Sequence, residues 1–67
     1  MDTKLIGKTL VDLRHEKGVT IEKVARDVNI TPSALGNYER GIRIPRDEIK
    51  VRLAKYYNRT VDAIFYV

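Results

Sequence analysis

The polar and basic residues best suited to bind a ligand or do chemistry lie between positions 31 and 46. Ser33 and Asn37 are four residues apart, so on a helix they would share one face. A hydroxyl and a carboxamide can each donate and accept hydrogen bonds. The stretch from Arg40 to Arg46 adds three arginines and no acidic residue. Short polar side chains beside such a run of positive charge predict contact with a polyanion.

No other residues indicate a catalytic or metal site. The sequence has no cysteine and one histidine, His15, which we interpret as an ordinary surface residue. Asp47 and Glu48 are adjacent, but they open a predicted helix, where acidic side chains favour the positive end of the helix dipole. Glycine-rich phosphate loops and nucleophile constellations are missing. We therefore expect a protein that is not an enzyme and has no cofactor and no metal.

Length and composition restrict the class further. The 67 residues suffice for one domain, and 13 lysines and arginines against nine acidic residues give a net charge of +4. A basic balance fits a polyanionic partner. No apolar run approaches the roughly 20 residues that span a membrane, and the N-terminus does not resemble a signal peptide. We expect a cytoplasmic protein with no membrane contact.

The helices that would position these residues can be predicted from the apolar residues, which recur three and four positions apart. This spacing is typical of amphipathic helices. Ile6, Leu10 and Leu13 mark a first helix that Gly18 ends. Thr20 caps a predicted second helix, Thr20–Val28, and Asn29 suits a tight turn.

The remaining chain predicts three more helices. Thr31 and Pro32 begin a third helix, Thr31–Arg40, with Gly41 after it. A fourth ends at Asn58 and is followed by a short fifth, and their inward residues are Ile49, Leu53, Ala54, Tyr57, Val61, Ile64 and Phe65. The expected class is all-α, with five short helices. Only about three residues separate the second and third helices, which is the helix-turn-helix arrangement in which the latter enters the major groove of DNA.

Several stretches resemble the Cro/repressor family of helix-turn-helix regulators, also called the XRE family. The strongest is Ile30–Gly41, supported by Leu13–Thr20 and Leu53–Tyr57, and the resemblance extends from about Ile6 to Phe65. It implies a single lambda-repressor-like domain over residues 1–67, with the helix-turn-helix at about 20–40. The implied function is a sequence-specific regulator of transcription, more specifically a repressor, that binds double-stranded DNA.

Three positions depart from the family pattern. Ile21 stands where the family usually has a glutamine that meets a DNA phosphate, so that contact is lost or passes to Thr20 and Lys23. Asn29 replaces the usual turn glycine, and Gly36 replaces a serine or charged residue. The departure at Ile21 affects one contact with the DNA backbone, and none of the three affects the expected fold.

The third helix is expected to present one polar face. Ala34, Leu35 and Tyr38 should pack inward, and the opposite face should carry Pro32, Ser33, Gly36, Asn37 and Arg40. The first four of these are expected to contact DNA bases. The resemblance gives base reading to Ser33 and Asn37. Gly36 either drifted neutrally or allows close approach to DNA, with room for a thymine methyl. The expected phosphate contacts are Thr20, Lys23, Thr31, Arg40 and Arg43, although a solvated face explains Lys23 equally well.

Two further expectations concern contacts between helices and between chains. By the resemblance, Arg14 and Glu39 should form a buried ion pair across the domain. A homodimer is expected through apolar residues near the C-terminus, namely Tyr56, Val61, Ile64, Phe65, Tyr66 and Val67. The other interpretation is that these residues continue into a longer protein. A second function class also remains, a protein-interaction module such as an antitoxin or an antagonist of another regulator, but the neutral-to-basic face favours DNA.

Overall fold

Side-chain caps fix where four of the helices begin. In the computed structural model, which describes residues 1–67, the helices are α1 Thr3–Lys17, α2 Ile21–Asp27, α3 Pro32–Glu39, α4 Asp47–Tyr56 and α5 Val61–Phe65. Asp2, Thr20, Thr31 and Thr60 each accept a hydrogen bond from a backbone N–H in the first turn that follows. Thr20 and Thr31 are thus caps, and the helices that they begin are slightly shorter than the predicted ranges.

Residues with left-handed backbone close the turns. Gly18, Asn29, Gly41 and Asn58 have φ angles between 56° and 73°. All four are positions at which the sequence predicts a helix end or a tight turn. α2 and α3 are therefore joined by a short connection, and the all-helical class with five helices is confirmed.

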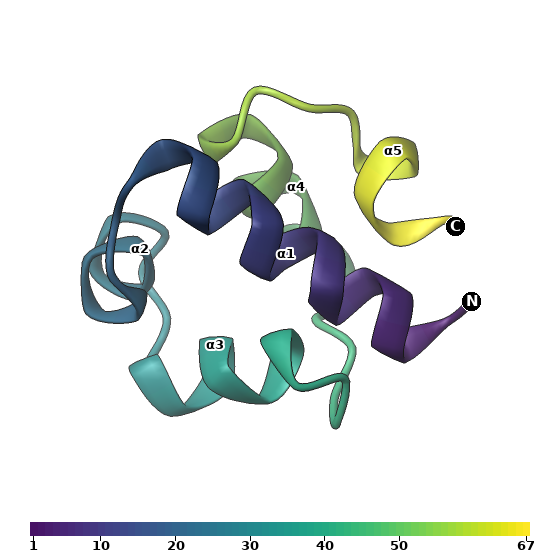
Figure 1. Cartoon of the computed structure of the whole chain (residues 1–67), viewed down its shortest axis with the longest axis horizontal. Helices are drawn as coiled ribbons and strands as arrows, with labels where there is room; N and C mark the ends of the chain where they lie inside the picture. The colour runs from purple at the N-terminus through teal and green to yellow at the C-terminus, as the bar shows by residue number, and fades with distance from the viewer.

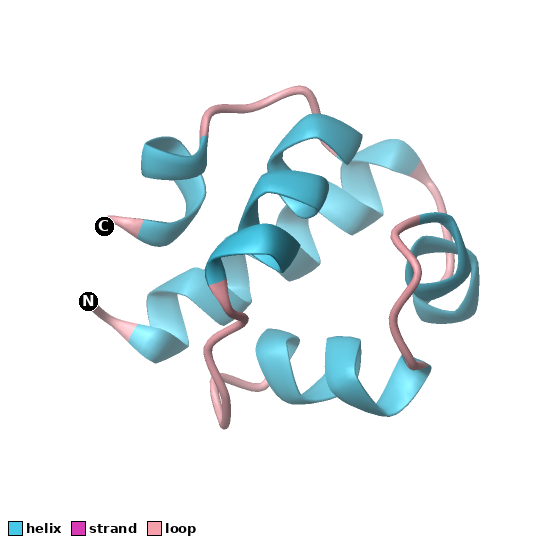
Figure 2. Ribbon diagram, turned by 180° about the vertical axis from the view of Figure 1, so that it is seen from behind, coloured by secondary structure: helices cyan, strands magenta, loops and turns pink.

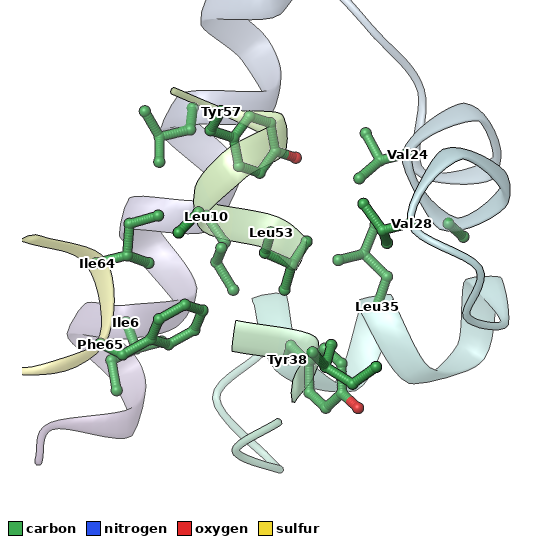
Figure 3. Packing of buried hydrophobic residues seen from close by; sticks show 14 residues of the cluster. Ile6, Leu10, Val24, Val28, Leu35, Tyr38, Leu53, Tyr57, Ile64 and Phe65 are labelled. Atoms are coloured by element: carbon green, nitrogen blue, oxygen red, sulfur yellow. The ribbon is translucent and has the colours of Figure 1, made fainter. Parts of the chain in front are cut away.

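One apolar cluster joins all five helices (Figure 3). Leu10, Leu35, Leu53 and Phe65 have no exposed surface. Fourteen residues make up the cluster: Ile6, Leu10, Leu13, Val24, Ala25, Val28, Leu35, Tyr38, Ile49, Leu53, Ala54, Tyr57, Ile64 and Phe65. Val61, expected inward, is half-buried and packs against its edge.

Two glycines allow α1 to cross very close to the end of α3. A Cβ on Gly7 would collide with the backbone of Glu39, and one on Gly41 would lie 2.9 Å from the carbonyl oxygen of Thr3. Neither position therefore has room for a side chain. The C-terminal end of α3 is fixed directly against the backbone of α1.

The third helix is supported on its inner side and free on the other. α3 packs against both α1 and α2, and Figure 1 shows it along the lower edge of the molecule. The view from behind places α3 at the same edge, whereas α5 and both chain termini lie together elsewhere (Figure 2). The fold thus holds one short helix rigidly at the surface.

Candidate nucleic-acid interface

The exposed part of α3 begins at its first turn. Thr31, Pro32 and Ser33 are exposed, whereas Ala34, Leu35 and Tyr38 turn inward. The Thr31 hydroxyl oxygen accepts from the Ala34 N–H at 3.0 Å. Its own proton stays free to be donated. The Ser33 side chain, one turn before Asn37, has no hydrogen-bond partner within the chain that would occupy it.

Gly36 departs from its expected exposure. It lies on the outward face of α3, yet it is buried. The Arg40 side chain covers it, because a Cβ on Gly36 would lie 3.0 Å from Arg40 Nη1. Long helical side chains turn back toward the N-terminus and so cover the residue four positions before them. Arg40 therefore covers Gly36 in the free chain, and close approach of Gly36 to DNA stays a prediction.

Asn37 and Arg40 are joined directly. Arg40 Nη2 donates to Asn37 Oδ1 at 2.8 Å. Asn37 is half-buried, and its backbone carbonyl accepts from the N–H groups of Ile42 and Arg43 at 3.0 and 3.3 Å. These bonds fold the loop after α3 back onto the helix. The exposed Arg43 side chain consequently begins beside the last turn of α3.

The two candidate phosphate contacts at α2 differ in whether their donor groups already have a partner within the chain. Thr20 caps α2 by accepting from the Lys23 N–H at 3.1 Å, which leaves its hydroxyl proton available. Lys23 Nζ donates to Asp27 Oδ2 at 2.9 Å, so an acidic partner already offsets its charge. Hydrogen bonds from Lys23 and from the Tyr56 hydroxyl hold the pKa of Asp27 below its usual value.

A two-pronged ion pair lies beneath this surface. Arg14 Nε and Nη2 donate to the two carboxylate oxygens of Glu39 at 2.8 and 3.2 Å, and Nη1 donates to the Val19 carbonyl. The side chains are only 15% and 5% exposed. The bond to Glu39 raises the pKa of the Arg14 guanidinium. Glu39 is thereby turned away from the surface, where its charge would oppose a polyanion.

The residues expected at a dimer interface differ in whether they are buried in their own chain or exposed. Ile64 and Phe65 have no exposed surface, so they belong to the core of their own chain and the expectation that they form an interface is wrong. Tyr56 donates to Asp27 at 2.8 Å and lies under Lys17, which ties it to α2 and the end of α1. Tyr66 and Val67 remain exposed, at 54% and 44%.

The N-terminus adds apolar residues that sequence reasoning missed. Met1 and Leu5 are 61% and 44% exposed, and the Asp2 N–H donates to the Val67 carbonyl at 3.4 Å. We call the group Met1, Leu5, Tyr66 and Val67 the terminal apolar patch. No sequence pattern places the two termini side by side, because their contact depends on the packing of α5 against α1.

Other positioning residues were also missed. Arg52 Nη1 donates to the Val28 carbonyl at 3.2 Å and so fixes the end of α2 against α4. Gly7, described above, allows the approach of α1 to α3. The sequence did offer a signal for Gly7, because a glycine in the middle of an amphipathic helix often has a packing role. No group of three or more potential metal ligands is present, and no helix is long and apolar enough to cross a bilayer.

The helices α2 and α3, with their short connection, define this chain as a helix-turn-helix domain. A helix-turn-helix family matches residues 10–64. The chain belongs to this family, in the Cro/repressor or XRE type that the sequence predicted.

Individual relatives agree with this assignment. The chain is 35% identical over 57 residues to the HTH-type transcriptional regulator ImmR of Bacillus subtilis, a match that covers 85% of the chain and 45% of that protein. The chain thus spans about half the length of that curated relative.

Solved structures share the fold. The restriction-modification controller protein C.AhdI of Aeromonas hydrophila superposes with a TM-score of 0.87 at 28% identity, over 96% of this chain and 93% of that one. The clp gene regulator ClgR of Corynebacterium glutamicum gives a TM-score of 0.87 at 23% identity, over 98% of this chain and 70% of that one. The ClgR match shows the fold alone.

Proposed function

We propose that this chain is a sequence-specific, double-stranded DNA-binding domain that regulates transcription as a repressor. α3 enters the major groove, with Ser33 and Asn37 toward the bases and Pro32 beside them. The observation that supports this most is the outward face of α3, which is polar, free of acidic side chains and rigidly backed by α1 and α2. A catalytic role has no comparable support.

The proposed contacts with the DNA phosphates lie near both ends of α3. The free hydroxyl protons of Thr20 and Thr31 suit phosphate oxygens near the helix start, and Arg40 and Arg43 suit those near its end. Lys23 contributes less, because Asp27 offsets its charge. The buried position of Glu39 removes the one acidic side chain of α3 from the approaching phosphates.

Binding to a pool of random DNA duplexes tests the proposal. We expect selection of a shared sequence, and affinity that falls steeply as salt concentration rises, because phosphate neutralisation releases counterions. Binding of all duplexes with equal affinity would contradict sequence specificity. If no DNA bound but an unrelated protein partner did, the chain would instead belong to the antitoxin or antagonist class.

We propose further that the chain binds a palindromic site as a homodimer. One module this small makes few base contacts, and a two-fold dimer places two recognition helices about 34 Å apart, one turn of DNA. The terminal apolar patch is the available interface, since Ile64 and Phe65 are occupied in the core. Both chain termini, which carry this patch, lie away from the N-terminal end of α3, where Pro32 and Ser33 are exposed (Figure 1).

Sedimentation at micromolar concentration tests the dimer. Tyr66→Asp should give a monomer, because it places a charge in an apolar contact. His15→Asp, which adds the same charge near the far end of α1, should leave the dimer intact. A parent that is monomeric both free and on a palindromic duplex would contradict the proposal.

A further inference from the structure

Arg40 lies in a position that a phosphate contact alone does not explain. Its guanidinium lies across Gly36, with Nη1 3.0 Å and Cζ 3.5 Å from where a Cβ on Gly36 would be. Nη2 also donates to Asn37 Oδ1 at 2.8 Å. The guanidinium therefore occupies the outward face of α3, among the residues that face the bases.

Gly36 is what makes this position available. Glycine is a poor residue for a helix interior, and Gly36 has no left-handed backbone that would require it. A side chain at this position would push against the guanidinium and not against the backbone of the fold. A glycine at this position thus leaves room for the Arg40 guanidinium.

The bond from Arg40 fixes which way the Asn37 carboxamide points. Oδ1 accepts from a charged donor, and the reverse orientation would place the Nδ2 hydrogens against the guanidinium hydrogens. Adenine recognition by asparagine needs the amide oxygen to accept from the adenine amino group while Nδ2 donates to N7. With a guanidinium at that oxygen, an incoming amino group would meet further donors.

Guanine presents the opposite pattern. Its major-groove edge has two acceptors, N7 and O6. Asn37 Nδ2 keeps both of its hydrogens, and Arg40 keeps most of its five, since only one is spent on Asn37. The two side chains together form a surface of donors that matches this edge.

Given the proposed function, we infer that Arg40 and Asn37 act as one unit that recognises guanine in the major groove. Arg40 determines specificity directly, beyond any contact with phosphate. Asn37 alone would favour adenine; the Arg40 side chain over Gly36 changes the preference to guanine.

Selection from random duplexes by the parent and by three variants tests this. The base pair whose preference Asn37→Ala loses defines the position of Asn37. We expect the parent to select guanine there, and Arg40→Ala to lose the same preference. Arg43→Ala, the matched loss of a nearby arginine, should weaken binding at all sequences and keep the guanine. Adenine at that position, or guanine retained by Arg40→Ala, would overturn the inference while leaving DNA binding established.

Gly36→Ala is a fourth variant, and it carries little risk to folding. Alanine is the better helix former, so the unfolding temperature of the variant should be equal or higher. The added methyl group would lie 3.0 Å from Arg40 Nη1, so the guanidinium must move by a few tenths of an ångström, and the guanine preference should fall. An unchanged preference would overturn the inference.

Modified DNA gives the sharpest probe. Replacing the selected guanine by 7-deazaguanine, which lacks the N7 acceptor, should weaken parent binding by about 5- to 10-fold and leave Arg40→Ala binding unaffected. Inosine, which lacks only the minor-groove amino group, should bind the parent as guanine does. Equal losses for parent and Arg40→Ala with 7-deazaguanine would assign the contact to Asn37 alone and overturn the inference. A parent that selects no sequence would overturn the proposed function as well.

Discussion

The outward face of α3 and the surface around α5 are built in different ways. On α3, apolar and polar residues separate onto opposite sides, and one hydrogen bond, from Arg40 to Asn37, connects two of the polar side chains. At α5, which has five residues, neighbours differ sharply: Phe65, its last residue, is fully buried, whereas Tyr66, directly after it, is 54% exposed. A helix of two turns has distinct faces, but a single turn at the chain end is divided residue by residue by what packs against it.

The largest expected effect sharpens this contrast at α5. Phe65→Ala should lower the free energy of unfolding by about 3–5 kcal/mol, because it leaves a cavity in the core. Tyr66→Ala, one residue on, should lower it by less than about 1 kcal/mol. Urea unfolding of both variants at one low protein concentration measures the difference. Equal losses would mean that Phe65 and Tyr66 share an environment, contrary to the described packing.

A similar loss is expected beneath α3. Removing either Arg14 or Glu39 alone should cost about 3–5 kcal/mol of stability, because the other charge stays buried without its partner. Combining the two single alanine variants in a double-mutant cycle isolates their coupling. The matched control is Lys8–Asp12, an ion pair of similar length whose side chains are 70% and 56% exposed, and it should contribute less than about 1 kcal/mol. Coupling as small as in this control would contradict a structural role for the buried pair.

The two regions also differ in how far sequence reasoning reached. The helices, their caps and the polar face of α3 depend on local spacing, so Thr20, Thr31, Pro32 and Asn29 could be interpreted from the sequence. The environment of Phe65 depends on α1, which is distant in the chain. Helical spacing alone therefore predicted Phe65 both in the core and at an interface.

The same limit applies within the predicted site. Spacing put Gly36 and Arg40 on one face of α3, but only the side-chain conformation shows that Arg40 covers Gly36. The Lys23–Asp27 contact follows the familiar four-residue spacing and could have been predicted. The bond from Tyr56 to Asp27 could not, because α4 packs there from 29 residues away.

An intermediate effect is expected on DNA affinity. Asn37→Ala should weaken binding to the selected site by ~1–3 kcal/mol and relax the preference at one position, as for the loss of a base contact. Binding to random DNA should change far less, because phosphate contacts are retained. Titration of parent and variant against both duplexes measures this. Parallel losses on the two duplexes would contradict base recognition by Asn37.

A smaller and uniform effect is expected from the loop after α3. Arg43→Ala should weaken binding to all sequences alike and reduce the slope of log affinity against log salt by about one, because one phosphate contact is lost. Arg46, whose exposed side chain lies 3.8 Å from Glu48 at the start of α4, supplies the control. A slope unchanged in Arg43→Ala, or changed equally in Arg46→Ala, would remove Arg43 from the proposed contacts.

The smallest effect concerns Asp27, where α2 meets α4. Hydrogen bonds from Lys23 and Tyr56 lower the pKa of Asp27 in the folded chain relative to the unfolded one. A lowered folded-state pKa means that the stabilisation is complete above the unfolded value of about 3.9 and is lost as pH falls through the folded value. The unfolding temperature of the parent should therefore exceed that of Asp27→Asn at neutral pH, and the gap should close below about pH 4. Tyr56→Phe removes one of the two hydrogen bonds, so it should reduce the gap and leave the Lys23 contribution. A gap that stays constant from pH 2 to 7 would show that Asp27 stabilises the contact by its shape and not by its charge.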